Sequence, residues 1–289
     1  MSIRFPSRNY SQRMRPRSGS GGGCIRIFIA LAMVIFALVS FFGSKVTNPV
    51  TGEDQYISIT PEQEIAIGLQ STPEMMQQFD GLDPDPGLQQ IVDEVGGQLL
   101  RSSFATRSDY PFEFHLLADQ ETINAFALPG GQVFITRALF DRLETEGQLA
   151  GVLAHEIVHV LSRHGAERIA EMQLTQGLTG AVILATYDPN NPSSQQAAQI
   201  AVLVGQLVNM KFGRDDEIQS DTLGVKIMSQ AGYDPRSMVS VMHVLDQASS
   251  GNRPPEFFST HPNPENRIGK IEAAIAEVYP NGIPAGLTP

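Results

Sequence analysis

The run LAGVLAHEIVHVLSRHG, residues 149–165, is the feature that most limits how this chain can fold. It consists largely of Leu, Ala, Val and Ile, yet it contains His155, Glu156 and His159. A helix this apolar is expected to be buried, and burying a polar group without a hydrogen-bond partner costs about 2–7 kcal/mol. The three titratable side chains therefore need a partner inside the protein.

The spacing of these residues predicts a metal ion as that partner. On an α-helix, His155 and His159 lie one turn apart on the same face, so both imidazoles can reach one ion. Glu156 lies about 100° round the helix from His155. That position is beside the ion, where a general base for an activated water belongs. A surface helix that matched the pattern by chance would instead show a polar face.

A catalytic zinc site needs three protein ligands and one open position, so a third ligand must come from elsewhere. His164 lies about 180° round the same predicted helix from His155, and we interpret it as a helix-end residue that interacts with the helix dipole. Glu217 and Asp221 share a helix face at i, i+4, where two carboxylates repel unless a cation is near. From spacing alone, this pair is either a ligand with an acceptor for a histidine ring N–H, or a solvated acidic first turn.

HExxH at 155–159 followed by ExxxD at 217–221 resembles the M48 family of zinc metallopeptidases, in particular its exported bacterial members. The resemblance spans roughly residues 59–278 and includes INAFALPGG before the HExxH helix and STHPNPENRI after it. It implies an α+β, zincin-like fold that is mainly helical, with a small antiparallel sheet and HExxH on the active-site helix. The segment departs from the family at Gln219–Ser220, where Glu-Ala is common, but neither position needs to bind metal.

The resemblance also implies roles for individual residues. It implies one zinc ion per chain, Glu156 as catalytic base, Asp221 next to the ligands, and as ligands His155, His159 and Glu217. It places His261 over the zinc, where this residue either stabilises the tetrahedral intermediate or plugs the open coordination position. It places Arg267 near the site. Without the family, His261 is interpreted as a structural loop residue and Arg267 as a salt-bridge partner on the last helix.

The segment INAFALPGG offers a strand at the lip of the cleft, which could pair with an extended peptide through backbone hydrogen bonds. In similar enzymes, the positions of Asn124 and Ala125 lie beside the scissile bond. The alternative is an ordinary hairpin in which Pro129 and Gly130 only turn the chain.

Charge is distributed unevenly along the chain. Residues 1–52 contain no Asp or Glu, so all 31 acidic residues lie in 53–289, and the whole chain has a net charge of −11. Nucleic-acid binding needs a basic surface, so this acidic part argues against a nucleic-acid partner. The single cysteine, Cys24, precludes an intrachain disulfide.

An apolar run, CIRIFIALAMVIFALVSFFG at 24–43, follows the basic leader and predicts a transmembrane anchor. Its uncharged part, 27–43, spans most of a bilayer core about 30 Å thick. Arginines before the run place the N-terminus in the cytoplasm. The part after the run would then be extracytoplasmic, at a bacterial inner membrane crossed once. A cleaved signal peptide is the alternative, although no A-x-A site follows the run.

The chain divides into five predicted segments. They are a disordered basic leader (1–23), the anchor or uncleaved signal (24–43), a linker (44–58), the peptidase domain (59–280) and a tail (281–289).

Cap and turn residues predict the elements of that domain. They are a helix capped by Thr60, a helix at 88–100, antiparallel strands at 112–118 and 132–136, the HExxH helix from Thr145 to a left-handed cap at Gly165, a helical hairpin at 177–185 and 197–208, and helices at 215–231 ended by Gly232, at 235–248 and at 264–279 capped by Asn263.

These features predict a membrane-anchored zinc endopeptidase that acts on extracytoplasmic protein or peptide substrates, in particular misfolded or misassembled ones. The alternative is a quality-control module that binds envelope proteins while His261 keeps the zinc site plugged. A metal-dependent hydrolase of small amides would need a second chemical motif, which the sequence does not offer.

Overall fold

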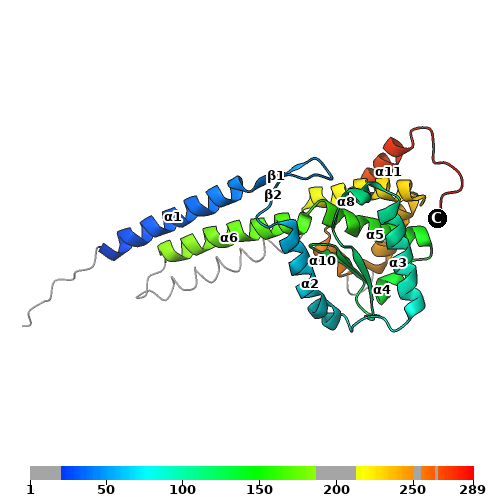
Figure 1. Cartoon of the computed structure of the whole chain (residues 1–289), viewed down its shortest axis with the longest axis horizontal. Helices are drawn as coiled ribbons and strands as arrows, with labels where there is room; N and C mark the ends of the chain where they lie inside the picture. Colours follow the sequence, from blue (N-terminus) through cyan, green and yellow to red (C-terminus); the bar gives the residue numbers. More distant parts are fainter. Residues whose placement is uncertain (1–20, 187–212, 250–254, 264–265) are drawn as a thin grey trace, which may run out of the picture.

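Two long helices, α1 (Gly21–Gly43) and α6 (His164–Thr186), lie side by side and project from a body built of helices and a small sheet (Figure 1). The computed structural model describes residues 21–186, 213–249, 255–263 and 266–289. Gly21–Gly23 begin α1, whereas the rest of the predicted leader lies outside the described residues. The 197–208 half of the predicted helical hairpin lies outside them as well.

The body is mainly helical, as the α+β fold class predicts. Its elements are α2 (Pro61–Gln78), α3 (Pro86–Arg101), the 3₁₀ helix η1 (Phe104–Arg107), β3 (Glu113–Leu117), β4 (Ala125–Leu128), β5 (Gln132–Thr136), α4 (Arg137–Phe140), α5 (Glu146–Leu161), α8 (Arg214–Ala231), α9 (Arg236–Ser249), α10 (Phe257–Thr260) and α11 (Arg267–Val278).

The sheet of the body has the strand order β3–β5–β4. β4 and β5 form the predicted antiparallel hairpin, with Ala125 opposite Ile135. Gly130 and Gly131 turn the chain with φ of 85° and 111°, values that favour glycine. β3 instead pairs with β5 in parallel, where we expected antiparallel pairing. After β3, the chain crosses to the far edge of the sheet, where it forms β4. Strand β5 then returns between β3 and β4 and runs in the same direction as β3.

Helix α5 lies at the centre of the body, and every residue in 147–161 is buried. It begins after Thr145, whose side chain accepts a hydrogen bond from the backbone N–H of Gln148. Helices α3, α8 and α9 pack around it. This packing explains why its sequence is apolar on all sides.

Two predicted caps are confirmed and two helix boundaries differ. Thr60 forms the capping box of α2, and Gly232 ends α8 with φ of 86°. By contrast, α5 already ends at Leu161, and the left-handed residue is Arg163 (φ 56°), not Gly165. Arg163 is held there because its Nε donates a 2.7 Å hydrogen bond to Glu64.

Gly165 lies inside α6, where a Cβ would be 3.0 Å from Pro129 Cγ, so close packing explains this glycine. The second helix boundary that differs is the start of α11. Its N-cap is Asn266 (φ 60°), three residues after the cap predicted at Asn263, and the helix begins at Arg267.

The segment expected as a linker forms an antiparallel hairpin of β1 (Lys45–Thr47) and β2 (Asp54–Tyr56). The hairpin packs on the end of α5. Asn48 Nδ2 donates to the carbonyl of Leu161 at 2.9 Å, and Gln55 Nε2 donates to that of Ser162 at 2.6 Å. Carbonyls at a helix C-terminus lack partners within the helix, so these bonds explain why the segment is ordered.

The last residues of the chain pack against the body. Thr288 accepts a hydrogen bond from Asp234 N–H at 2.8 Å, and the carbonyl of Pro289 accepts one from Gly147 N–H at 2.8 Å. The predicted tail therefore contacts the first turn of α5.

Helix α1 contains Ile25–Gly43, which is long and apolar enough to cross a membrane by length and composition. Its exposed side chains include Phe28 and Phe36. Its contacts are mainly with α6, because the body does not extend along it (Figure 1).

Candidate metal centre

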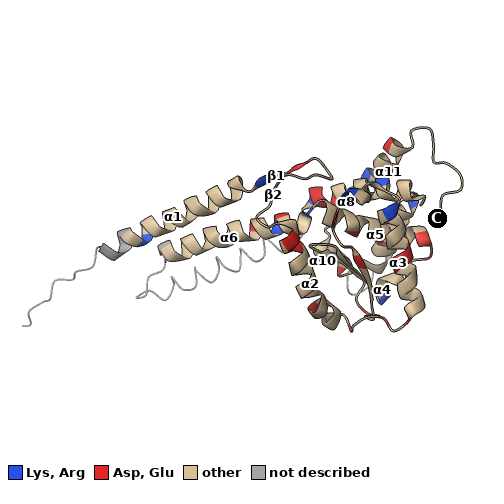
Figure 2. Cartoon of the chain, in the orientation of Figure 1, with Lys and Arg blue, Asp and Glu red and all other residues tan. Residues whose placement is uncertain are grey.

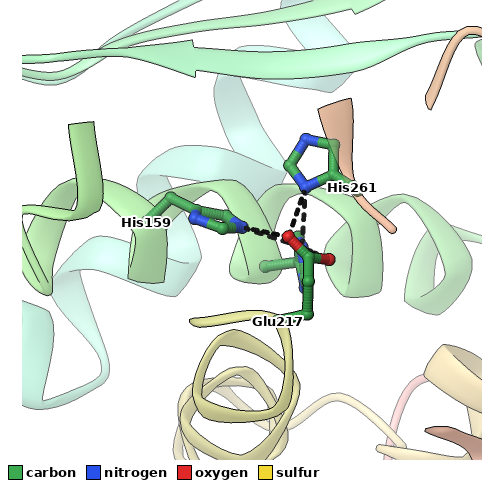
Figure 3. A group of neighbouring side chains, drawn as sticks. His159, Glu217 and His261 are labelled. Atoms are coloured by element: carbon green, nitrogen blue, oxygen red, sulfur yellow. Dashed lines mark hydrogen bonds and ion pairs between the residues drawn. The ribbon is translucent and has the colours of Figure 1, made fainter. Parts of the chain in front are cut away.

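Four buried side chains from three parts of the chain meet at one point. α5 supplies His155 and His159, α8 supplies Glu217, and the residue after α10 is His261. One ligand atom from each lies within 4.8 Å of all the others. Figure 3 shows the rings of His159 and His261 directed at the carboxylate of Glu217.

The distances among the first three residues fit a tetrahedral metal site. His155 Nε2 and His159 Nε2 are 3.1 Å apart. Glu217 Oε2 is 3.4 Å from His155 Nε2, and Glu217 Oε1 is 3.4 Å from His159 Nε2. Ligands at about 2.0–2.1 Å from one zinc ion lie about 3.3 Å apart at tetrahedral corners. Two imidazoles and a carboxylate are also a donor set typical of zinc.

His261 lies as close to these ligand atoms as they lie to one another. Its Nδ1 is 3.3 Å from His155 Nε2 and 3.1 Å from Glu217 Oε1. Its ring stacks on Phe257, with ring centroids 4.4 Å apart. The structure thus brings His261 to the fourth corner, a placement that the sequence without the family would not indicate.

Asp221 and Arg267 lie behind the ring of His155. His155 Nδ1 donates to Asp221 Oδ1 at 2.9 Å, which leaves Nε2 with a lone pair for a metal. Arg267 donates to both oxygens of Asp221, at 2.7 and 2.9 Å, and lies 3.3 Å from Glu217. Asp221 therefore accepts the Nδ1–H of His155 and is itself held by Arg267.

His164 does not behave as a helix-end residue of α5. Because α5 ends before it and Arg163 turns the chain, His164 begins α6 and returns to the site. Its Nδ1 is 2.9 Å from His159 Nδ1, and its Nε2 is 2.8 Å from Gln219 Oε1. An angle of 180° from His155 holds only on one continuous helix, and the break between α5 and α6 removes that condition. The available signal was a third histidine five residues after His159.

Glu156 lies beside the four residues and is fully buried. Its carboxylate oxygens accept no hydrogen bond from any described residue, and His261 Nε2 lies 3.6 Å from its Oε1. Three buried carboxylates, those of Glu156, Glu217 and Asp221, thus face the one guanidinium of Arg267. A divalent cation would offset this excess of negative charge, so the residues fit a metal ion.

Burial and neighbouring charges shift the pKa values of the site. Burial lowers the pKa of His159 well below its usual value, so its ring is neutral. Burial would also lower the pKa of His155, but hydrogen bonds to Asp221 and Glu217 raise it to about 9. Burial raises the pKa of Glu156, because desolvation penalises its charged form. A carboxylate shifted in this direction is suited to accept a proton near neutral pH.

A cavity of about 570 Å³ lies along the edge strand β4. Asn124, Phe126 and Ala127 line one side, and Glu256 and Thr260, next to His261, line another. Asn124 Oδ1 is buried and accepts no hydrogen bond from the described residues. The side chain of Ala125 is buried in the core, and Ala125 is not among the residues that line this cavity.

Comparisons with known proteins agree with this arrangement. The model of peptidase family M48 matches residues 85–275. The beta-barrel assembly-enhancing protease of Escherichia coli (strain K12) is 35% identical over 251 residues, which cover 83% of this chain and 50% of that protein. The mitochondrial metalloendopeptidase OMA1 of Schizosaccharomyces pombe is 36% identical over 171 residues, with 59% and 48% covered. The chain spans about half the length of these relatives.

Proposed function

This chain belongs to peptidase family M48, and we propose that it is a zinc-dependent endopeptidase that is anchored in a membrane and cleaves extracytoplasmic proteins. The observation that carries the proposal is the spacing of His155, His159 and Glu217, each pair 3.1–3.4 Å apart, beside the buried carboxylate of Glu156.

In the proposed reaction, the residues of the centre have separate roles. A zinc ion held by His155, His159 and Glu217 would polarise the scissile carbonyl and make a water molecule more acidic. Glu156 takes the proton of the attacking water and returns it to the leaving amine. Asp221 fixes the ring of His155 by accepting its Nδ1–H, and Arg267 in turn fixes Asp221.

Substrate would bind along β4. As an edge strand, β4 has backbone groups that can pair with an extended peptide, which gives affinity with little sequence selectivity. Asn124 and the backbone of Ala125 would then lie beside the scissile bond. Weak selectivity suits an enzyme that removes misfolded or misassembled envelope proteins, and the name of the Escherichia coli relative refers to barrel assembly.

The proposed location is a bacterial inner membrane. Helix α1 would cross it once with the basic N-terminus in the cytoplasm, so that the body faces the periplasm. The acidic body gives no support to a nucleic-acid partner.

The test uses the full chain purified in detergent, with unfolded casein as substrate. Elemental analysis should find one zinc per chain, and a chelator should abolish cleavage, with recovery when zinc is added back. Absence of zinc from protein purified without chelator, or cleavage that survives complete zinc removal, would contradict the proposal.

A second candidate function is a quality-control module whose metal centre stays plugged. The position of His261 Nδ1, 3.3 Å from His155 Nε2 and 3.1 Å from Glu217, favours this alternative. His261→Ala separates the two. A rise in casein cleavage indicates a plug that holds the site closed, and a loss of cleavage with zinc retained indicates a residue that stabilises the oxyanion.

A further inference from the structure

The outer part of α6 has the composition of a helix that contacts lipid. After Glu171, residues 172–186 contain no charged side chain. Figure 2 shows the charged residues of α6 gathered at its junction with the body, where they are Glu167, Arg168 and Glu171. Farther out, the large apolar side chain of Val182 is 50% exposed. The body does not reach this part of α6 (Figure 1).

This part of α6 packs directly on α1. A Cβ at Gly177 would lie 2.9 Å from the Cβ of Ala37, and one at Gly180 would lie 3.4 Å from Met33 Cε. The two backbones therefore approach closely, as small residues allow between helices in membranes. Because positions rise along α6 as they fall along α1, the two helices are antiparallel and reach outward together.

The register sets how deep α6 extends relative to α1. Met33 lies ten residues before Gly43, so Gly180 is level with a point about 15 Å along α1 from its end at the body. That is about half of a hydrocarbon core of about 30 Å. The remaining residues to Thr186 continue about 9 Å farther. If α1 crosses a bilayer, α6 cannot remain outside it.

We propose that α6 enters the bilayer alongside α1 and that lipid covers its exposed apolar face. The inference rests on the proposed anchoring by α1 and deepens it, because it gives the body two membrane-inserted helices instead of one. A cavity between the two helices is lined near the body by the polar side chains of Ser40, Ser44 and Gln173, which mark the expected membrane border, and farther out by Met33 and Phe36.

This placement defines a class of substrate. His164, which contacts the metal ligand His159, lies seven residues before Glu171, or about 10 Å along α6. The metal centre is therefore held close to the membrane surface. The substrates expected from this position are polypeptide segments that lie next to the bilayer.

The chain has no tryptophan, so single tryptophans provide a specific test. We would introduce Val182→Trp, Phe36→Trp on α1 and Leu82→Trp on the body into the full chain in phospholipid vesicles. The replaced side chains are all at least half exposed, at 50%, 75% and 51%. Lipids brominated at mid-chain should quench Val182→Trp to an extent comparable with Phe36→Trp and leave Leu82→Trp unquenched. Aqueous iodide should show the opposite order.

The result for Phe36→Trp separates the two proposals. If lipid quenches Phe36→Trp and iodide alone quenches Val182→Trp, α1 is anchored and the inference about α6 is wrong. If neither quencher reaches Val182→Trp, protein covers that face, and the inference is again wrong. If lipid fails to quench Phe36→Trp, the anchoring proposal itself fails and the placement of α6 fails with it. Thermal unfolding of each variant checks that the body is folded.

Discussion

Helices α5 and α1 both have apolar sequences but lie in opposite surroundings. Residues 147–161 of α5 are all buried, whereas Phe36 on α1 is 75% exposed. Three helices of the body surround α5. This buried apolar helix carries the ionisable residues His155, Glu156 and His159. Apolar composition alone therefore does not distinguish a core helix from a membrane helix. The placement of ionisable residues distinguishes the two kinds of helix, because interior charges require partners that a protein core can supply.

The largest expected effect comes from removing the one interior carboxylate that has no hydrogen-bond donor among the described residues. Glu156→Gln should lower casein cleavage by about 10²–10⁴-fold, the usual contribution of a general base. Zinc content should stay the same, because Glu156 is not among the proposed ligands. Glu171→Gln makes the same chemical change on α6 and should leave cleavage unchanged. An active Glu156→Gln protein would refute the role of this residue.

Truncating an apolar side chain should have different effects in the two regions. Leu153 of α5 is fully buried, so Leu153→Ala should lower the free energy of unfolding of the body by about 2–5 kcal/mol. Phe36→Ala removes a larger side chain, but one that makes little contact within the protein, and should leave that free energy nearly unchanged in detergent. Denaturant titration monitored by circular dichroism measures both. Similar losses for the two variants would show that α1 is part of the folded core.

The interior charges should also give the metal-free protein a pH dependence. The pKa of His155 is raised from 6.5 to about 9, so its contribution to stability is complete below about pH 6.5 and is lost as the pH rises through about 9. The pKa of Asp221 is lowered, so its contribution is present above its unfolded value and is lost only in acid. The Tm of chelator-treated protein should therefore fall between pH 6.5 and 9.5.

Asp221→Asn is the control for that measurement, because it removes the first hydrogen-bond partner that raises the pKa of His155. The fall in Tm between pH 6.5 and 9.5 should be smaller in this variant. A metal-free wild-type Tm that is constant or rises over the same range would contradict the assignment.

The smallest expected effect concerns the contact between α1 and α6. Gly177→Ala places a Cβ 2.9 Å from the Cβ of Ala37 and should push the helices apart. Gly180→Ala places a Cβ 3.4 Å from Met33 Cε, the flexible end of a side chain that can move away. Overpacking costs about 1–3 kcal/mol, offset in part by the higher helix propensity of alanine. A cysteine cross-link between Ser40→Cys and Gln173→Cys, which line the same cavity between the two helices, should therefore form more slowly with Gly177→Ala than with Gly180→Ala. Equal rates would show that the helices do not pack as described.

Much of the candidate metal centre could be predicted from the sequence because two of the proposed ligands, His155 and His159, lie on one helix. The i, i+4 spacing of His155 and His159 fixes their relation before any tertiary contact forms, and the Glu217–Asp221 pair follows the same rule on α8. Membership in family M48 supports the zincin-like fold class that these motifs indicated. The position of Glu217 against the two rings needed the structure, or the family, because it depends on how α8 packs on α5.

The features that the sequence did not reveal depend on single turns or on long-range pairing. The parallel register of β3 depends on where the chain crosses the sheet, and no local pattern records that crossing. The contact of His164 with His159 depends on the left-handed backbone conformation of Arg163. Arginine rarely adopts this conformation in proteins. The side chain of Arg163 donates a hydrogen bond to Glu64, which is 99 residues away in the chain, so no local pattern records this contact.

The short connection between α5 and α6 has a mechanical consequence. Only Ser162 and Arg163 separate the two helices, and the first residue of α6 contacts the ring of His159. Helix α6 is therefore an arm about 35 Å long whose inner end touches the proposed metal ligand His159. If α6 enters a bilayer as proposed, a change in its tilt, such as a thinner bilayer would impose, would reach the metal centre through a connection of only two residues.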